Sequence, residues 1–426
     1  MIELALFGGP KTIAQPFAKY NSIGREEIEA GKAVLESGLL SGFYGSWDEK
    51  FFGGDKVREF ERDWATFFEV KHAVTVNSNT SGLIAAVGAI GIEPGDEVIV
   101  SPWTMSASAT AIVVWNAIPV FADIEDETFN LDPASIERNI TPRTRAIMVT
   151  DIFGHAADMD AIMAIARKHK LKVIEDCAQA PAARYRGRYA GTIADIGVFS
   201  LNYHKHIHTG EGGVCVTNDA ALAERLQLIR NHAEAVVAGK GIEDISNMIG
   251  FNFRMTEIEA AIGIEQLKKL KTLTDARTSQ AARLDAGLSG LRGLRTSVVK
   301  PDCSHVYYAY PLVYDDAQTG VPREQVVKAL RAEGVPASMG YLNLHLLPMY
   351  QKRIAHGRNG FPWSASFYTG AVSYAKGICP VAEDLQDRRF IVMGMCLFDY
   401  TAQDIDLLVS AFRKVWSSLD RLKQAA

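Results

Sequence analysis

Hydrophobic residues change their spacing repeatedly along the first half of the chain. Between residues 72 and 218, short runs rich in valine and isoleucine alternate with stretches in which apolar residues recur every three to four positions. Short apolar runs are typical of buried strands, and a spacing of three to four is typical of helices. This pattern predicts strands at 72–76, 97–100, 118–124, 145–152, 172–178, 196–201 and 212–218, with helices at 81–92, 106–115 and 159–170. Such alternation predicts an α/β fold with a large, mostly parallel seven-stranded sheet.

The pattern differs on either side of this region. Two helical stretches precede it, at 24–37 and 55–70. After it, the spacing predicts long helices at 219–233 and 254–291, a strand at 305–315, and helices at 323–334 and 402–420. We therefore place a domain boundary near residue 275. Residues 1–275 would form the large α/β domain with its N-terminal segment, and residues 276–426 a smaller C-terminal α+β domain.

Composition narrows the class of protein. The formal net charge of the 426 residues is -5 and the basic residues are scattered, which argues against nucleic-acid binding. The five cysteines are far apart, which argues against a zinc ribbon or a redox dithiol and fits a reducing compartment. The start lacks a basic signal region, and no apolar run reaches about 18 residues. We expect a cytoplasmic protein that does not enter the membrane.

One lysine lies in unusual surroundings, in the stretch NYHKHIHTGEGG at 202–213. Lys205 follows the strand that ends at Ser200, and Asp176 ends the preceding predicted strand of the sheet. In a parallel sheet both side chains would reach the same edge, where ligands bind. A surface lysine and a turn aspartate are the simpler interpretations. Together, however, an amine and a carboxylate are what pyridoxal phosphate needs, for its Schiff base and for its protonated ring nitrogen.

A phosphate-binding turn is also available. The stretch NSNTSG at 77–82 follows a strand and begins a helix. Small hydroxyl residues there are ordinary helix caps, but a helix N-terminus also binds anions. Thr80 and Ser81 are candidates for this role, and Ser200 could add a hydroxyl group.

Other chemistries fit the stretch poorly. His204, His206 and His208 alternate, but neither an HExxH motif nor a cysteine pair completes a zinc site, so we predict no metal. The TGEGG tail matches neither the dinucleotide nor the P-loop fingerprint.

These blocks, with GIEPGDEVIVSPWTMSASATAIVVWNAIPVFADI and GFNFRMTEIEAAIGIEQLKKL, resemble the DegT/StrS (DegT/DnrJ/StrS) sugar aminotransferases. The resemblance is strong over residues 20–275 and implies a fold-type I enzyme that depends on pyridoxal phosphate. It implies that Lys205 forms the Schiff base and carries the proton, and that Asp176 pairs with the ring nitrogen. Gln179 would lie near the phenolic oxygen of the ring.

The resemblance also implies contacts with the phosphate and a second subunit. Thr80, Ser81 and Ser200 would bind the phosphate. Asn252 would reach it from the neighbouring subunit, which implies a homodimer with shared active sites. Met105 stands where the family often has an aromatic residue stacked on the ring, and Trp103 is an alternative for that contact.

The implied reaction moves an amino group from glutamate or glutamine to a keto-sugar, which we expect to be nucleotide-linked. A keto-cyclitol of the scyllo-inosose type is the alternative acceptor. A sugar 3-dehydratase would have histidine in place of Lys205, and a cofactor-binding regulator would not need the lysine and acid pair.

Two further residues are candidates for contacts with the substrate. Trp47 lies in an aromatic, glycine-punctuated segment at 43–55 that would pack as a loop or close as a lid. His345 lies in the HLLPMY stretch at 345–350, where a loop histidine without a function is the alternative.

Overall fold

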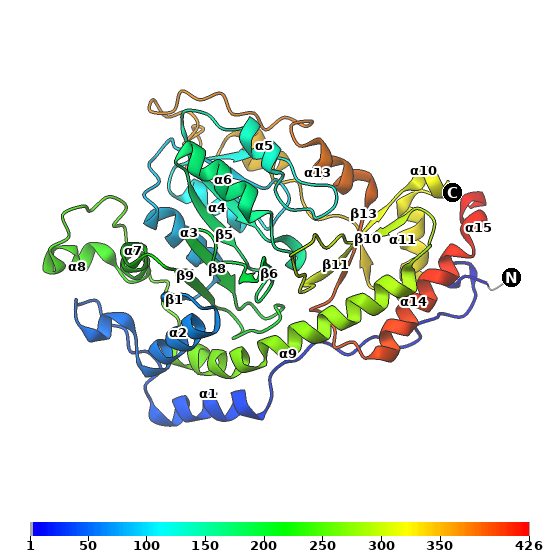
Figure 1. Cartoon of the computed structure of the whole chain (residues 1–426), viewed down its shortest axis with the longest axis horizontal. Helices are drawn as coiled ribbons and strands as arrows, with labels where there is room; N and C mark the ends of the chain where they lie inside the picture. The colour runs from blue at the N-terminus through cyan, green and yellow to red at the C-terminus, as the bar shows by residue number, and fades with distance from the viewer. Residues whose placement is uncertain (1–2, 426) are drawn as a thin grey trace.

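The computed structural model describes residues 3–425 and contains a large central sheet (Figure 1). Strand β9 runs antiparallel to both of its neighbours, and the other neighbouring strands are parallel. The mostly parallel seven-stranded sheet expected from the sequence is therefore confirmed. In spatial order its strands are β1 (His72–Val76), β9 (Gly213–Thr217), β8 (Ile196–Ser200), β5 (Lys172–Asp176), β4 (Thr144–Thr150), β2 (Glu97–Val100) and β3 (Ile118–Phe121).

Helices cover both faces of this sheet. Alternate residues of a strand point to opposite faces, so Val98 and Val100 pack in one apolar cluster and Ile99 in another. The first cluster contains residues of α3 (Asn79–Ala89), α4 (Ala107–Val114) and α7 (Ala220–Arg230). The second contains residues of α2 (Asp55–Phe67), α5 (Pro133–Arg138), α6 (Met159–His169) and the first half of α9 (Glu257–Leu288). Burial on both faces explains the nearly continuous apolar runs of the strands.

The helix α9 connects the two parts of the molecule. It begins with a capping box, in which Thr256 and Glu259 satisfy the first amide groups of the helix. It continues for 32 residues without a break and passes beneath the smaller sheet (Figure 1). Helix α1 (Arg25–Ser37) packs along its first half.

The smaller sheet is antiparallel and has four strands, of which only β11 was expected. Strands β10 and β12 have three and two residues and leave little local signal. Strand β13 is an apolar run of five residues that the sequence interpretation missed. In spatial order the strands are β10 (Leu294–Thr296), β11 (Ala309–Tyr314), β13 (Phe390–Gly394) and β12 (Ala337–Ser338). Their core is shared with α11 (Arg323–Ala332), α14 (Ala402–Trp416), α15 (Leu419–Gln424) and the second half of α9.

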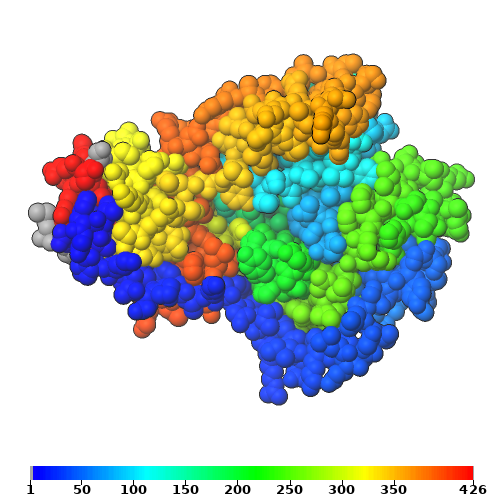
Figure 2. Space-filling view, turned by 180° about the vertical axis from the view of Figure 1, so that it is seen from behind, coloured from blue at the N-terminus to red at the C-terminus, as the bar shows by residue number. Residues whose placement is uncertain are grey.

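Two segments cross between the two parts of the molecule. Leu4 and Ile13 pack in the small-domain core, and the following residues run along the molecule to α1 (blue in Figure 2). Residues 344–379 return to the large domain, where Tyr368 donates to Glu97 and Tyr374 to the carbonyl of Pro119. In Figure 2 this orange segment lies over the cyan part of the chain.

The remaining elements are short. They are β6 (Arg184–Tyr185), β7 (Arg188–Tyr189), α8 (Ala233–Lys240), α10 (Asp316–Thr319), α12 (Pro348–Lys352) and α13 (Pro380–Asp384). Within residues 3–425, no helix has the length and the apolar run that a membrane crossing requires.

Candidate active site

A pocket of about 230 Å³ opens at the carboxyl ends of the central strands. Its lining includes Thr150 at the end of β4, Asp176 at the end of β5 and Ser200 at the end of β8. This is the edge at which parallel α/β sheets bind their ligands.

Lys205 lies in this pocket and is almost fully buried. Its Nζ is 4.2 Å from the centroid of the Tyr308 ring. Burial lowers the pKa of the Lys205 amine to about 8, although the charge of Asp176 acts in the opposite direction. About a tenth of the amine is therefore unprotonated, and nucleophilic, at pH 7.

Asp176 is buried beside Lys205 and is held by three donors. Ser108 Oγ donates to Oδ2 at 2.9 Å, while the amide of Ala178 and Asn79 Nδ2 donate to Oδ1 at 3.2 and 3.4 Å. Burial raises the pKa of the carboxyl group, and the hydrogen bonds and Lys205 lower it. A fixed carboxylate inside a pocket suits a partner that carries a positive charge on nitrogen.

The N-terminus of α3 forms one wall of the pocket. Ser78 caps this helix by accepting from the amide of Ser81, and both Ser78 and Thr80 line the pocket. Ser81 was expected to bind phosphate, but it is not among the lining residues. Its hydroxyl group donates to Asn77 Oδ1 at 2.6 Å, which uses it inside the turn. Ser78, the cap itself, is one of the lining residues that the sequence interpretation missed.

Two other expected residues line the pocket. Gln179 Nε2 donates to the hydroxyl group of Tyr341 at 3.0 Å, and Met105 is 60% exposed there. Trp103, the alternative to Met105, does not line the pocket. It is fully buried, and its indole packs against Phe390, with ring centroids 4.5 Å apart.

Three expected residues lie away from the pocket lining. Asn252 is exposed, and its Oδ1 accepts from Arg254 Nε at 2.8 Å. The Trp47 ring packs against Phe51 at 5.0 Å between centroids, so in this chain it forms part of the packing of its segment and does not cover the pocket.

His345 was expected to contact the substrate, and the structure places it elsewhere. It is fully buried, and its Nε2 lies 2.9 Å from Glu383 Oε1. A histidine enclosed in this way has no surface for a substrate.

Comparison with known proteins decides the family. Residues 32–386 match the profile of the DegT/DnrJ/EryC1/StrS aminotransferase family. The chain belongs to this family. It is an aminotransferase, and its cofactor is pyridoxal phosphate.

The aminotransferase is similar to several named proteins. The chain is 36% identical to L-glutamine:2-deoxy-scyllo-inosose aminotransferase of Streptoalloteichus tenebrarius, over 97% of each chain. It is 39% identical to GDP-perosamine synthase of Caulobacter vibrioides, over 70% of this chain and 79% of that one. The structure of S. venezuelae DesV in complex with a ketimine intermediate superposes with a TM-score of 0.76 at 30% identity, covering 92% of this chain and 94% of that chain.

The pocket of the aminotransferase fits its cofactor. A buried lysine amine, a fixed carboxylate and a helix N-terminus line the same cavity. These groups match the aldehyde, the ring nitrogen and the phosphate of pyridoxal phosphate.

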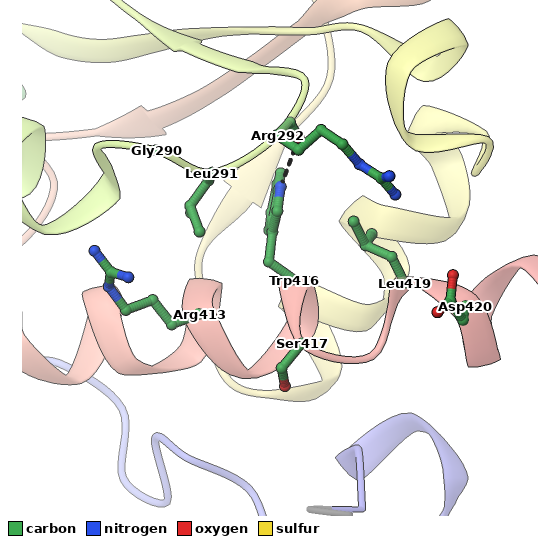
Figure 3. Close-up of a pocket in the computed structure, with 8 residues that line it drawn as sticks. All are labelled: Gly290, Leu291, Arg292, Arg413, Trp416, Ser417, Leu419 and Asp420. Carbon is green, nitrogen blue, oxygen red and sulfur yellow. Dashed lines mark hydrogen bonds between the residues drawn. The ribbon is translucent and has the colours of Figure 1, made fainter.

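A larger hollow of about 350 Å³ lies in the small domain and is not part of this site (Figure 3). Two of its lining side chains donate hydrogen bonds to backbone carbonyl groups nearby. The Trp416 indole donates to the carbonyl of Arg292 at 2.9 Å, drawn as a dashed line in Figure 3, and Arg413 Nε donates to the carbonyl of Gly287 at 2.8 Å.

A cluster of acidic groups lies on the other face of β5. Asp151, Glu175 and Cys177 are buried, and ligand atoms of the three lie within 4.8 Å of one another. The Cys177 thiol donates to Asp151 Oδ2 at 3.0 Å. Burial raises the pKa of Asp151 to about 6 and that of Glu175 well above its usual range. Two carboxyl groups this close favour sharing a proton.

Proposed function

We propose that this aminotransferase takes an amino group from glutamate or glutamine and delivers it to a keto-sugar, with a nucleotide-linked sugar as the first candidate. The observation that carries the proposal is the placement of Lys205 and Asp176 in one pocket beside the N-terminus of α3. The lysine favours amino transfer over the dehydration that a histidine would perform at this position.

The residues that line the pocket would have different roles in the reaction. When bound, pyridoxal phosphate supplies an electron sink for the reacting carbon. Lys205 would hold the cofactor and move the proton at Nζ, for which a pKa of about 8 is suitable. Asp176 would keep a proton on the ring nitrogen, and Gln179 would donate toward the phenolic oxygen. Met105 would pack on the ring face.

The phosphate would bind at the first turn of α3. Thr80 and Ser200 offer hydroxyl groups, and Ser78 joins them in the lining. Ser81 would act through the turn, by orienting its free amide groups.

A keto-cyclitol is the second candidate acceptor. A specific observation favours it: the match to the 2-deoxy-scyllo-inosose enzyme covers 97% of both chains, whereas the match to GDP-perosamine synthase covers 70% of this one. The similarity to the cyclitol enzyme therefore extends over nearly all of this chain.

We also propose that the enzyme works as a homodimer with shared active sites. Among residues 3–425, Lys205 is the one lysine or arginine that lines the pocket. A phosphate group and the carboxylates of the amino donor need more positive charge and more donors than this. Asn252 of a second subunit, with Arg254 beside it, would supply them. The five cysteines form no disulfide within residues 3–425, which supports a cytoplasmic location.

The test uses purified enzyme with bound pyridoxal phosphate. Glutamate and glutamine are compared as donors from the absorbance change of the cofactor, and the two acceptors are then a GDP-linked keto-sugar and 2-deoxy-scyllo-inosose. Inhibition by GDP, competitive with the acceptor, indicates a nucleotide-sugar site, and its absence with turnover of 2-deoxy-scyllo-inosose indicates a cyclitol site. An enzyme that returns the amino group to neither class of ring would refute the proposal.

A further inference from the structure

The rim of the active-site pocket carries a carboxylate that has no role so far. Glu211 lines the pocket and is exposed, and Asn202 Nδ2 donates to its Oε1 at 2.8 Å. The glycine-rich tail brings the two residues together. Gly210 pairs with Asn202 in an isolated bridge, and its φ of 89° lets the chain turn there.

Asn202 holds Glu211 at a cost. Its own Oδ1 is buried and, within residues 3–425, has no hydrogen-bond donor. Turning the amide over would instead place that oxygen against the carboxylate, which is repulsive. An unsatisfied buried oxygen is unfavourable, so the arrangement that holds Glu211 needs an explanation.

The surroundings leave the carboxylate without a cation. In the described part of the chain, no lysine or arginine forms an ion pair with Glu211, whose other oxygen remains free to accept. His204 lies on the same rim, but burial and the neighbouring Lys205 lower its pKa to about 4, so it is uncharged at neutral pH. The rim therefore presents a fixed hydrogen-bond acceptor with negative charge.

We propose that Glu211 is a specificity-determining residue that binds ring hydroxyl groups of the amino acceptor. The inference rests on the proposed function and adds how that acceptor is recognised. A polyhydroxylated ring offers several O–H donors, and their bonds to a carboxylate are charge-assisted. Glutamate, glutamine and the keto acid they leave carry carboxylates, which Glu211 repels. The same residue therefore favours the ring over the keto acid in the second half of the reaction.

A cation from a second subunit is the other occupant that would suit Glu211. Loss of such a pair would weaken assembly and both halves of the reaction alike, whereas loss of ring recognition weakens only the second half. The experiment separates these two roles.

The experiment compares E211Q with E127Q, which changes an exposed glutamate outside the pocket. Both variants are loaded with pyridoxal phosphate and converted to the aminated form with glutamate. They are then mixed with 2-deoxy-scyllo-inosose, a GDP-linked keto-sugar or 2-oxoglutarate. For E211Q we expect the KM of the accepted ring to rise about tenfold or more, because a charge-assisted bond becomes a neutral one. The KM for 2-oxoglutarate should stay the same or fall. E127Q should match the wild type throughout.

Several outcomes would overturn the inference. An unchanged ring KM in E211Q would do so, and so would equal losses with the ring and with 2-oxoglutarate, or a change in subunit assembly measured by light scattering. A wild-type enzyme that uses 2-oxoglutarate but neither ring overturns the proposed function, and this inference with it. If the wild type uses a ring and E211Q uses it equally well, the inference alone is overturned.

Discussion

Burial governs the chemistry of individual residues in this pocket. The amine of Lys205 and the carboxyl of Asp176 lie within one cavity, where loss of water lowers the pKa of the first and raises that of the second. Each remains useful because the other compensates part of that effect. The amine can lose its proton near neutral pH, and three hydrogen-bond donors offset part of the rise in the pKa of the carboxyl group.

The lowered pKa of Lys205 predicts how the cofactor-free enzyme captures pyridoxal phosphate. Only the neutral amine attacks the aldehyde, so the rate of covalent capture should rise with pH around a midpoint of about 8. An unperturbed lysine would place that midpoint at about 10.4. Stopped-flow absorbance over a pH series measures it, and Lys205→Ala should show no covalent capture at any pH. A midpoint above 10 would show that the amine is well hydrated.

Replacing Asp176 by asparagine should separate catalysis from binding. Asp176→Asn preserves the shape and can still accept from Ser108, but it removes the charge that would hold a proton on the ring nitrogen. We expect turnover to fall about a hundredfold or more, the scale of losing one preorganised electrostatic group. Cofactor affinity, measured by fluorescence titration, should change only a few-fold. Turnover close to that of the wild type would reduce Asp176 to a structural residue.

The acidic cluster behind β5 predicts a pH dependence of stability. The folded pKa of Asp151, about 6, lies above its usual value of 3.8. Ionising it in the folded protein therefore costs stability as pH rises from about 4 to about 6, and the full cost remains above that range. An amide does not ionise, so Asp151→Asn should gain thermal stability relative to the wild type as pH rises from 4 to 8. Asp63→Asn, a change on the surface, is the control. If the melting temperatures of Asp151→Asn and the wild type change with pH in the same way, the Asp151 carboxyl group is neutralised or solvated in the folded protein.

At the scale of elements, the loop that carries Lys205 is held from outside the large domain. The Tyr20 hydroxyl donates to the carbonyl of His206 at 2.5 Å, and the guanidinium of Arg277 lies 4.5 Å from the centroid of the Tyr20 ring. On the other side, the His206 ring bonds the carbonyl of Val306 at 2.7 Å. The N-terminal segment therefore helps to position Lys205.

Removing the hydroxyl group of Tyr20 should loosen this loop. Tyr20→Phe loses one hydrogen bond, worth roughly 1 kcal/mol, so cofactor affinity should fall about five-fold. Amide exchange in residues 201–209 should become faster. Tyr400→Phe is the matched control, because the Tyr400 hydroxyl has no hydrogen-bond partner among the described residues. Equal exchange rates in both variants would contradict a positioning role.

The sequence predicts helices and strands better than it predicts the contacts between segments that are far apart in the chain. All seven strands of the large sheet are short apolar runs, and this local signal was sufficient. The strand β12 has two residues and exists because Ala337 pairs with Met393, which no local pattern reveals. The site divides in the same way. Lys205 and Asp176 follow neighbouring strands, whereas Tyr308 and Tyr341 enter the pocket from more than a hundred residues away.

At the scale of the whole molecule, the shared active site can be tested by mixing subunits. If Asn252 acts across an interface, Lys205→Ala and Asn252→Ala chains that are inactive alone should regain activity together. With random exchange, about half of the dimers are mixed and each has one intact site, so recovery should reach about a quarter of wild-type activity. Activity is followed after mixing under conditions that allow exchange. If the subunits exchange without recovery, Asn252 serves its own chain or neither.

The unbroken helix α9 limits how such enzymes can be recombined. Its 32 residues span about 48 Å, with Leu270 buried in the large domain and Leu284 in the small one. A chimaera joined at residue 275 would cut this helix between its two cores, whereas a junction within residues 289–293, after its last turn, would leave it whole. The N-terminal residues would also have to travel with the small domain that they pack against. Exchange of pocket loops is therefore a more practical route to new acceptors than exchange of domains.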